Sequence, residues 1–70
     1  MANSKLPSPV RVGRRLRKLR GDRTQAQVAD DLGISVSSIA SYELGERTPR
    51  DKTKADIAYY YGVSVGELFF

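Results

Sequence analysis

A repeated pattern of residues that begin and end helices is the feature of this chain that most constrains its fold. Thr24 is followed three residues later by Gln27, the spacing at which a hydroxyl and a Gln side chain reciprocally cap a helix N-terminus. Gly33 stands where a residue of left-handed conformation would end that helix. Comparable starting and ending signals recur at Ser8–Pro9, Ser35, Ser64 with Glu67, Gly21, Gly45 and Gly62. These starting and ending signals predict several short helices.

The apolar residues between these signals follow the helical period. Val12, Leu16 and Leu19 fall at i, i+4 and i+7 and so form one stripe along a helix. Sustained alternation of apolar and polar residues, which would indicate strands, does not occur. The sequence therefore predicts an all-α fold with helices over residues 9–20, 24–32, 35–44, 50–61 and 64–70. The start of the first is left open between Pro9 and Val12.

Residues 28–42 have the spacing of two short helices held at a steep angle by a tight turn. Ala29 lies four residues before Gly33, Ile39 six residues after Gly33, and Tyr42 three residues further on. A small side chain at Ala29 lets the two helices approach, and Gly33 tolerates the positive φ of the turn. Ile39 and Tyr42 would pack the second helix against the first.

Charge is distributed unevenly along the chain. The whole sequence has 12 Lys and Arg against 8 Asp and Glu. Residues 1–23 hold eight of these bases and one acid, a balance of 8 − 1 = +7, whereas residues 24–70 hold four bases and seven acids, a balance of −3. A basic third joined to a mildly acidic remainder indicates an anionic partner.

The composition also argues against several classes of function. The chain has no Cys and no His, so it lacks disulfides, thiolate metal ligands and the commonest general base. We therefore expect no enzymatic activity, no cofactor and no bound metal. No apolar run approaches the ~20 residues of a membrane span, and the N-terminus lacks the apolar stretch of a secretory signal. We expect a cytoplasmic protein that does not bind membranes.

The segment TQAQVADDLGISVSSIASYELGERTP, from Thr24 to Pro49, resembles the phage repressor and Cro-type helix-turn-helix family of DNA-binding transcriptional regulators. VGRRLRKLR before it and YYGVSVGELF after it are similar to the first and last helices of that family, so the resemblance covers about residues 12–69. It implies a compact five-helix, lambda-repressor-like DNA-binding domain with the helix-turn-helix at about residues 24–44. The domain would span residues 9–70, preceded by a flexible basic arm at residues 1–8.

The resemblance also implies roles for individual residues. The helix over 35–44 would lie in the major groove, with its base-reading positions at Val36, Ser37 and Ser41. Phosphate contacts would fall to Thr24, Gln25, Ser35, Ser38, Arg47 and Arg50. At the helix that opens at Thr24 and Gln25, the free backbone amides and the Gln25 side chain would point at a phosphate. Lys5 and Arg11 would follow the DNA as arm contacts, and Arg20 and Glu43 match a structural salt bridge. Because Val and Ser cannot recognise guanine or adenine bidentately, we expect thymine methyl groups and DNA shape to contribute to specificity.

These features predict a sequence-specific double-stranded DNA-binding transcriptional regulator of the repressor type. The alternative is a protein-interaction module that uses the same helix-turn-helix fold to bind a partner regulator or toxin. We expect a weak homodimer, at least on DNA, with Phe70 and either Val63 or Val65 at its seam. No small-molecule ligand is evident.

Overall fold

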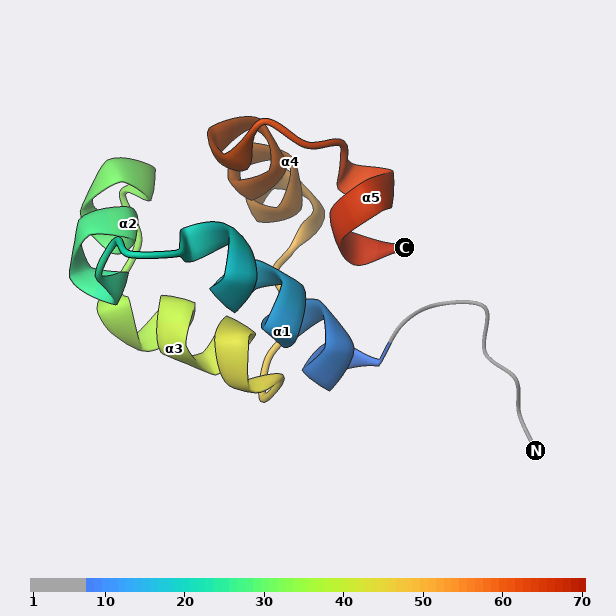
Figure 1. The fold of residues 1–70 in the computed structure, drawn as a ribbon, viewed down its shortest axis with the longest axis horizontal. Helices are drawn as coiled ribbons and strands as arrows, with labels where there is room; N and C mark the ends of the chain where they lie inside the picture. Colours follow the sequence, from blue (N-terminus) through green and yellow to red (C-terminus); the bar gives the residue numbers. More distant parts are fainter. Residues whose placement is uncertain (1–7) are drawn as a thin grey trace.

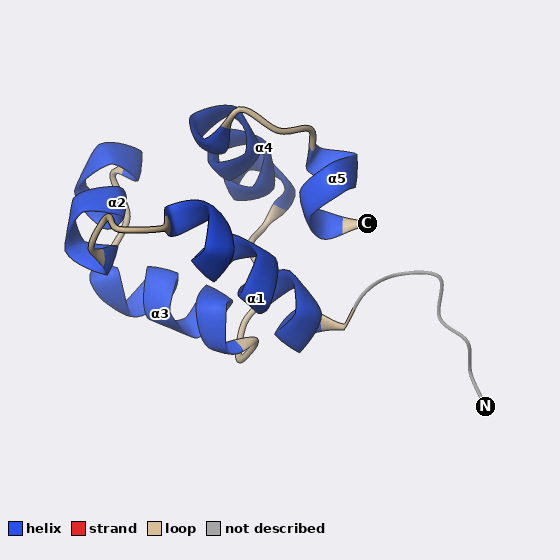
Figure 2. Ribbon diagram, in the orientation of Figure 1, coloured by secondary structure: helices blue, strands red, loops and turns tan. Residues whose placement is uncertain are grey.

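The structure is a computed structural model that describes residues 8–70. Every regular element in this range is a helix, which confirms the all-α prediction (Figure 2). The helices are α1 (Pro9–Arg20), α2 (Gln25–Leu32), α3 (Val36–Leu44), α4 (Asp51–Tyr61) and α5 (Val65–Phe69). Figure 1 shows α1 between α3 on one side and the α4–α5 pair on the other, with α2 at the far end of α3.

The helix boundaries follow the predicted capping signals. The Thr24 hydroxyl accepts a hydrogen bond from the Gln27 amide at 3.0 Å, and the Gln27 side chain accepts one from the Thr24 amide at 2.8 Å. Ser64 and Glu67 form the same reciprocal box at α5. Gly33 ends α2 in the left-handed conformation, with φ 70°. These predicted boundaries are confirmed. Each depends on hydrogen bonds or a backbone conformation within a few residues of the chain, so it could be predicted without knowing how the helices pack.

Four helices begin one residue after the start of the predicted range, and α5 ends one residue before the predicted end, at Phe69. Thr24, Ser35 and Ser64 are N-caps, as their capping signals predicted, whereas Arg50 is the N-cap of α4 rather than its first helical residue. In all four N-caps ψ lies between 153° and 164°, in the extended region, and the helical conformation begins one residue later. At the first helix, Ser8 caps and Pro9 begins α1, which decides between the two predicted starts.

The buried side chains form two adjoining clusters. The larger one joins α1, α3, α4 and α5, and the smaller one joins α2 and α3. Leu19, a member of the predicted apolar stripe, is half-buried and packs at the edge of the larger cluster, and the half-buried Leu32 and Tyr61 pack against both clusters. The larger cluster is formed by Val12, Leu16, Tyr42, Ile57, Leu68 and Phe69, and the smaller by Val28, Ala29 and Ile39.

Gly13 sets the distance between α1 and α3. A β-carbon built on Gly13 would lie 2.2 Å from the carbonyl oxygen of Glu43 and 2.9 Å from that of Tyr42. At the end of α3, a β-carbon on Gly45 would lie 2.8 Å from the backbone of Val10. The two helices therefore approach backbone to backbone along their length. This close approach requires glycine at positions 13 and 45, and no sequence pattern indicated the requirement at Gly13.

Candidate nucleic-acid interface

The α2–α3 pair is the part of the fold that carries most of the predicted site residues. Ile39 of α3 is 5% exposed and packs on Val28 and Ala29 of α2, which are 0% and 2% exposed. Gly33 and Ser35 make the connection between the helices short, because one ends α2 and the other caps α3. This packing holds α3 at a set angle to α2 and leaves the opposite side of α3 facing solvent.

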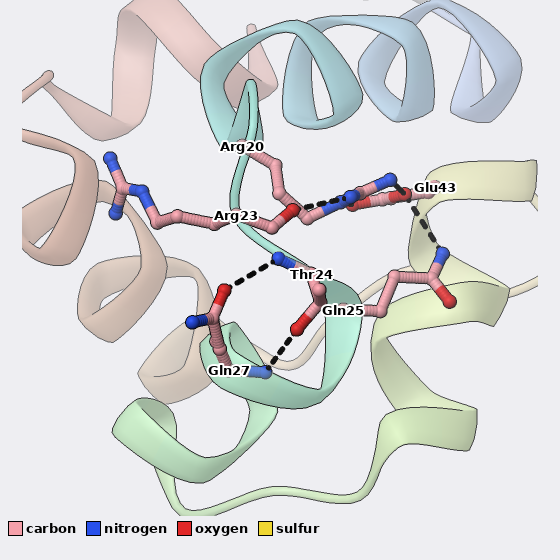
Figure 3. Close-up of polar contacts among 6 residues, drawn as sticks. All are labelled: Arg20, Arg23, Thr24, Gln25, Gln27 and Glu43. Atoms are coloured by element: carbon pink, nitrogen blue, oxygen red, sulfur yellow. Dashed lines mark hydrogen bonds and ion pairs between the residues drawn. The ribbon is translucent and has the colours of Figure 1, made fainter.

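Glu43 ties the ends of three helices together (Figure 3). Its carboxylate accepts hydrogen bonds from Arg20 Nε at 2.6 Å and from Arg20 Nη2 at 2.9 Å. It also accepts one from Gln25 Nε2 at 3.0 Å, and Arg20 Nη1 donates to the Arg23 carbonyl at 2.7 Å. The Glu43 side chain is 5% exposed and that of Arg20 is 15% exposed. The structure thus brings together the Arg20–Glu43 pair that the resemblance implied and adds Gln25 to it.

The environment of Glu43 favours its ionised form. Burial by itself would raise the pKa of this carboxyl group. The hydrogen bonds from Arg20 and Gln25, together with the positive charges of Arg20 and Arg17, outweigh that effect and hold the pKa of Glu43 below its ordinary value. The hydrogen bond to Glu43 likewise raises the pKa of Arg20. The pair is therefore charged on both sides at neutral pH.

Gln25 lies differently from the prediction. We expected both its backbone amide and its side chain to point at a DNA phosphate, but the side-chain amide donates instead to Glu43 across the α2–α3 junction. Its backbone amide, with that of Ala26, lies in the first turn of α2, where helical amides have no intrahelical partner. The positive end of the helix dipole at the same place favours an anion. Any phosphate contact of Gln25 is therefore expected from its backbone rather than its side chain.

The solvent-facing side of α3 consists of small, uncharged side chains. Val36 is 45% exposed, Ser37 is exposed and Ser41 is half-buried. Ala40 and Leu44 continue the same side at three and seven residues after Ser37, and Leu44 is 60% exposed. Neither residue was among the predicted base-reading positions, although their spacing from Ser37 places them on one helical face. We call Val36, Ser37, Ala40, Ser41 and Leu44 the α3 outer face.

Ser35 and Ser38 are engaged with each other at the start of α3. The Ser35 oxygen accepts a hydrogen bond from the Ser38 amide at 3.0 Å, and its hydroxyl donates to the Ser38 hydroxyl at 2.9 Å. Thr24 has the same capping role at α2. The Thr24 and Ser35 hydroxyls therefore cap α2 and α3, and the Ser38 hydroxyl is held by the Ser35 cap.

The two predicted cations of the α3–α4 connection are exposed. The Arg47 guanidinium lies 5.6 Å from the centre of the Tyr42 ring, a cation–π geometry that holds it against the end of α3. Arg50 caps α4 through its backbone only, because its side chain makes no capping hydrogen bond. Arg11 lies in the first turn of α1 rather than in an arm, and Lys5 falls outside the described residues.

Two other classes of site are not found among residues 8–70. Within this range no group of acidic side chains is arranged to hold a metal ion. None of the described helices is both long enough and apolar enough to cross a membrane.

Comparisons with known proteins agree with this geometry. Residues 14–68 match the family model described as Helix-turn-helix. The cryptic phage CTXphi transcriptional repressor RstR of Vibrio cholerae serotype O1 is 43% identical over 47 residues, which are 67% of this chain and 42% of that protein. A second RstR, also from Vibrio cholerae, is 34% identical over 56 residues, which are 77% of this chain and 50% of that protein. The chain thus spans about half the length of these curated relatives, and no solved structure matches it.

Proposed function

This chain belongs to the helix-turn-helix family, and on that premise we propose that it is a sequence-specific repressor of transcription that binds double-stranded DNA. The relatives described as transcriptional repressors support the proposal, since each aligns with at least two thirds of this chain. The observation that carries it is the uncharged outer face of α3, where Val36, Ser37 and Leu44 are exposed on a helix held by its packing against α2.

In the proposed complex α3 lies in the major groove. Its small side chains let the helix backbone come close to the base edges, where the hydroxyls of Ser37 and Ser41 can donate or accept. Val36 would contact thymine methyl groups, and Leu44 adds a second apolar contact at the other end of the helix. With no Arg, Asn or Gln on this face, DNA shape supplies the rest of the specificity.

Phosphate contacts would orient α3 in the groove. We assign them to the helix starts at Thr24–Gln25 and at Ser35 with Ser38, and to Arg47 and Arg50 on the α3–α4 connection. Arg47 would leave the Tyr42 ring to reach a phosphate, whereas Arg50 is already exposed. The Glu43 junction joins the α2 start to α3, so that a phosphate held by α2 determines where α3 meets the bases.

Two chains would bind two half-sites one helical turn apart. Phe70 is 53% exposed at the end of α5, and together with Val65 it is the apolar seam that we assign to this dimer. One such seam is small, so we expect the free chain to be monomeric at micromolar concentration and paired on DNA. Sedimentation of the free chain and of its DNA complex measures both states.

Selection from a random duplex pool at two salt concentrations tests the proposal. We expect enrichment of a two-fold related site, with affinity that falls with salt at a slope of about −0.9 per phosphate neutralised. Replacing thymine by deoxyuridine in the enriched site, which removes only the methyl group, should weaken binding if the apolar contacts are made. Failure to enrich any duplex would overturn the proposal and favour the alternative, a module that binds a partner protein.

A further inference from the structure

A groove of about 320 Å³ lies between α1 and α5, away from the α3 outer face. Its apolar lining comes from Leu19, Val63 and Leu68, and its rim carries Arg15, Lys18 and Glu67. Figure 1 shows α5 on the side of α1 opposite to α3. We propose that this α1–α5 groove binds a short acidic peptide segment that carries apolar side chains.

The rim of the groove has a net positive charge that the chain does not neutralise. The Arg15 guanidinium is held in place by hydrogen bonds from Nη1 to the carbonyls of Glu67 and Leu68, at 3.3 and 3.2 Å. Glu67 is turned back to the start of its own helix, where its carboxylate accepts a hydrogen bond from the Ser64 amide. Within residues 8–70, neither Arg15 nor Lys18 forms an ion pair with an acidic side chain.

The positive rim continues along the outer side of α1. Arg11, Arg14 and Lys18 are exposed and lie three and four residues apart, so they share one face of the helix. α1 contains no acidic residue. Like charges at this spacing oppose helix formation slightly, and an acidic partner would remove that cost.

The combination of lining and rim favours a peptide over the other two candidate partners. A DNA backbone would match the cations but would leave the apolar lining without a contact. A second copy docked about a two-fold axis that passes through the groove would bring Arg15 and Lys18 close to their own counterparts, which is unfavourable for like charges. A segment with Leu or Phe among Asp and Glu matches both features, because the groove holds an apolar side chain while the rim faces the carboxylates.

Titration of the full chain with a synthetic peptide, followed by methyl and amide NMR, tests this proposal. The peptide has Leu and Phe at i, i+3 and i+4 among Asp and Glu. One control peptide replaces every acid with an amide, and another replaces Leu and Phe with Ser. We expect shifts at Leu19, Val63 and Leu68 with the first peptide and at least about tenfold weaker binding of either control.

Lys18→Glu should weaken peptide binding about tenfold, whereas Lys52→Glu, an equal charge change on α4, should leave it within twofold. Equal loss in both variants would indicate general attraction of charge and overturn the proposal. The proposal would also be overturned if the peptide shifted residues of α3 rather than of the groove, or if a duplex without a binding site shifted the groove residues equally. The same holds if the groove signals shifted with protein concentration in the absence of peptide. No operator DNA is used, so failure here leaves the DNA-binding proposal standing.

Discussion

Replacing Glu43 by Gln should remove the junction of α1, α2 and α3 while preserving side-chain shape. The carboxylate accepts from three donors, with Oε1 facing Arg20 Nη2 and Gln25 Nε2, and Oε2 facing Arg20 Nε. A Gln amide has only one acceptor oxygen, so its NH2 group must face at least one of these donors in either orientation. The Arg20 charge also loses its counter-ion in a place where only 15% of its side chain is exposed.

Breaking a fully buried ion pair costs about 3–5 kcal/mol. Because the edge of Arg20 reaches solvent, we expect a loss of about 2–3 kcal/mol in the free energy of unfolding. A chain of this length has roughly 3–10 kcal/mol in total, so the change should lower Tm by about 10–20 °C. Urea unfolding followed by circular dichroism measures the loss in the free energy of unfolding.

Glu46→Gln provides the matched control, because Glu46 is exposed and forms no ion pair with another residue in the range 8–70. It should change stability by less than about 0.5 kcal/mol. A double-mutant cycle with Arg20→Met should give a coupling of about 2 kcal/mol. If Glu43→Gln were as stable as Glu46→Gln, the hydrogen bonds of Glu43 would contribute nothing measurable to the free energy of unfolding.

Three further predictions concern helix packing, helix capping and the pH dependence of stability. Gly13→Ala should lower the free energy of unfolding by about 3 kcal/mol or more, because the added carbon meets the backbone of α3 at 2.2 Å. Gly66→Ala is the control: the nearest atom to its added carbon lies at 3.7 Å, so stability should be unchanged or slightly higher. Thermal melts compare the two variants. Thr24→Ala should lose about 1 kcal/mol through the broken capping box, measurable by urea unfolding, and equal stability would contradict the capping role. The pKa of Glu43 is lowered in the folded protein. The contribution of ionised Glu43 to the free energy of unfolding is therefore complete above the pKa of a carboxyl group in the unfolded chain, about 4.3, and is lost as the pH falls through the pKa of Glu43 in the folded protein. Stability measured between pH 7 and pH 3 should therefore fall less steeply in Glu43→Gln than in the parent.

The features that the sequence predicted well are those determined by neighbours in the chain. Thr24 with Gln27, and Ser64 with Glu67, form their capping boxes over three residues. Gly33 ends α2 through its own backbone conformation. Such signals do not depend on which helices pack together, so helix positions could be inferred to within one residue.

The features that were missed depend on residues far apart in the sequence. Gly13 is required only because α3 crosses α1 at that point, and a glycine within a helix produces no periodic signal. Arg15 counted only as one of the eight bases of residues 1–23, yet it donates to carbonyls 52 and 53 residues away. The inward orientation of Gln25 likewise follows from the position of Glu43 on another helix.

Placing two carboxylates on the α3 outer face shows whether this face contacts DNA bases. Ser37→Glu with Ser41→Glu adds them four residues apart, and Ala55→Glu with Tyr59→Glu adds them at the same spacing on the exposed side of α4. An acid at Ser37, in the first turn of α3, favours the helix dipole, so the fold should persist. Fluorescence anisotropy on the selected duplex should show about a 100-fold or greater loss for the α3 pair and at most a few-fold loss for the α4 pair. Equal affinities of the two variants would contradict the assignment of α3 as the DNA-reading helix.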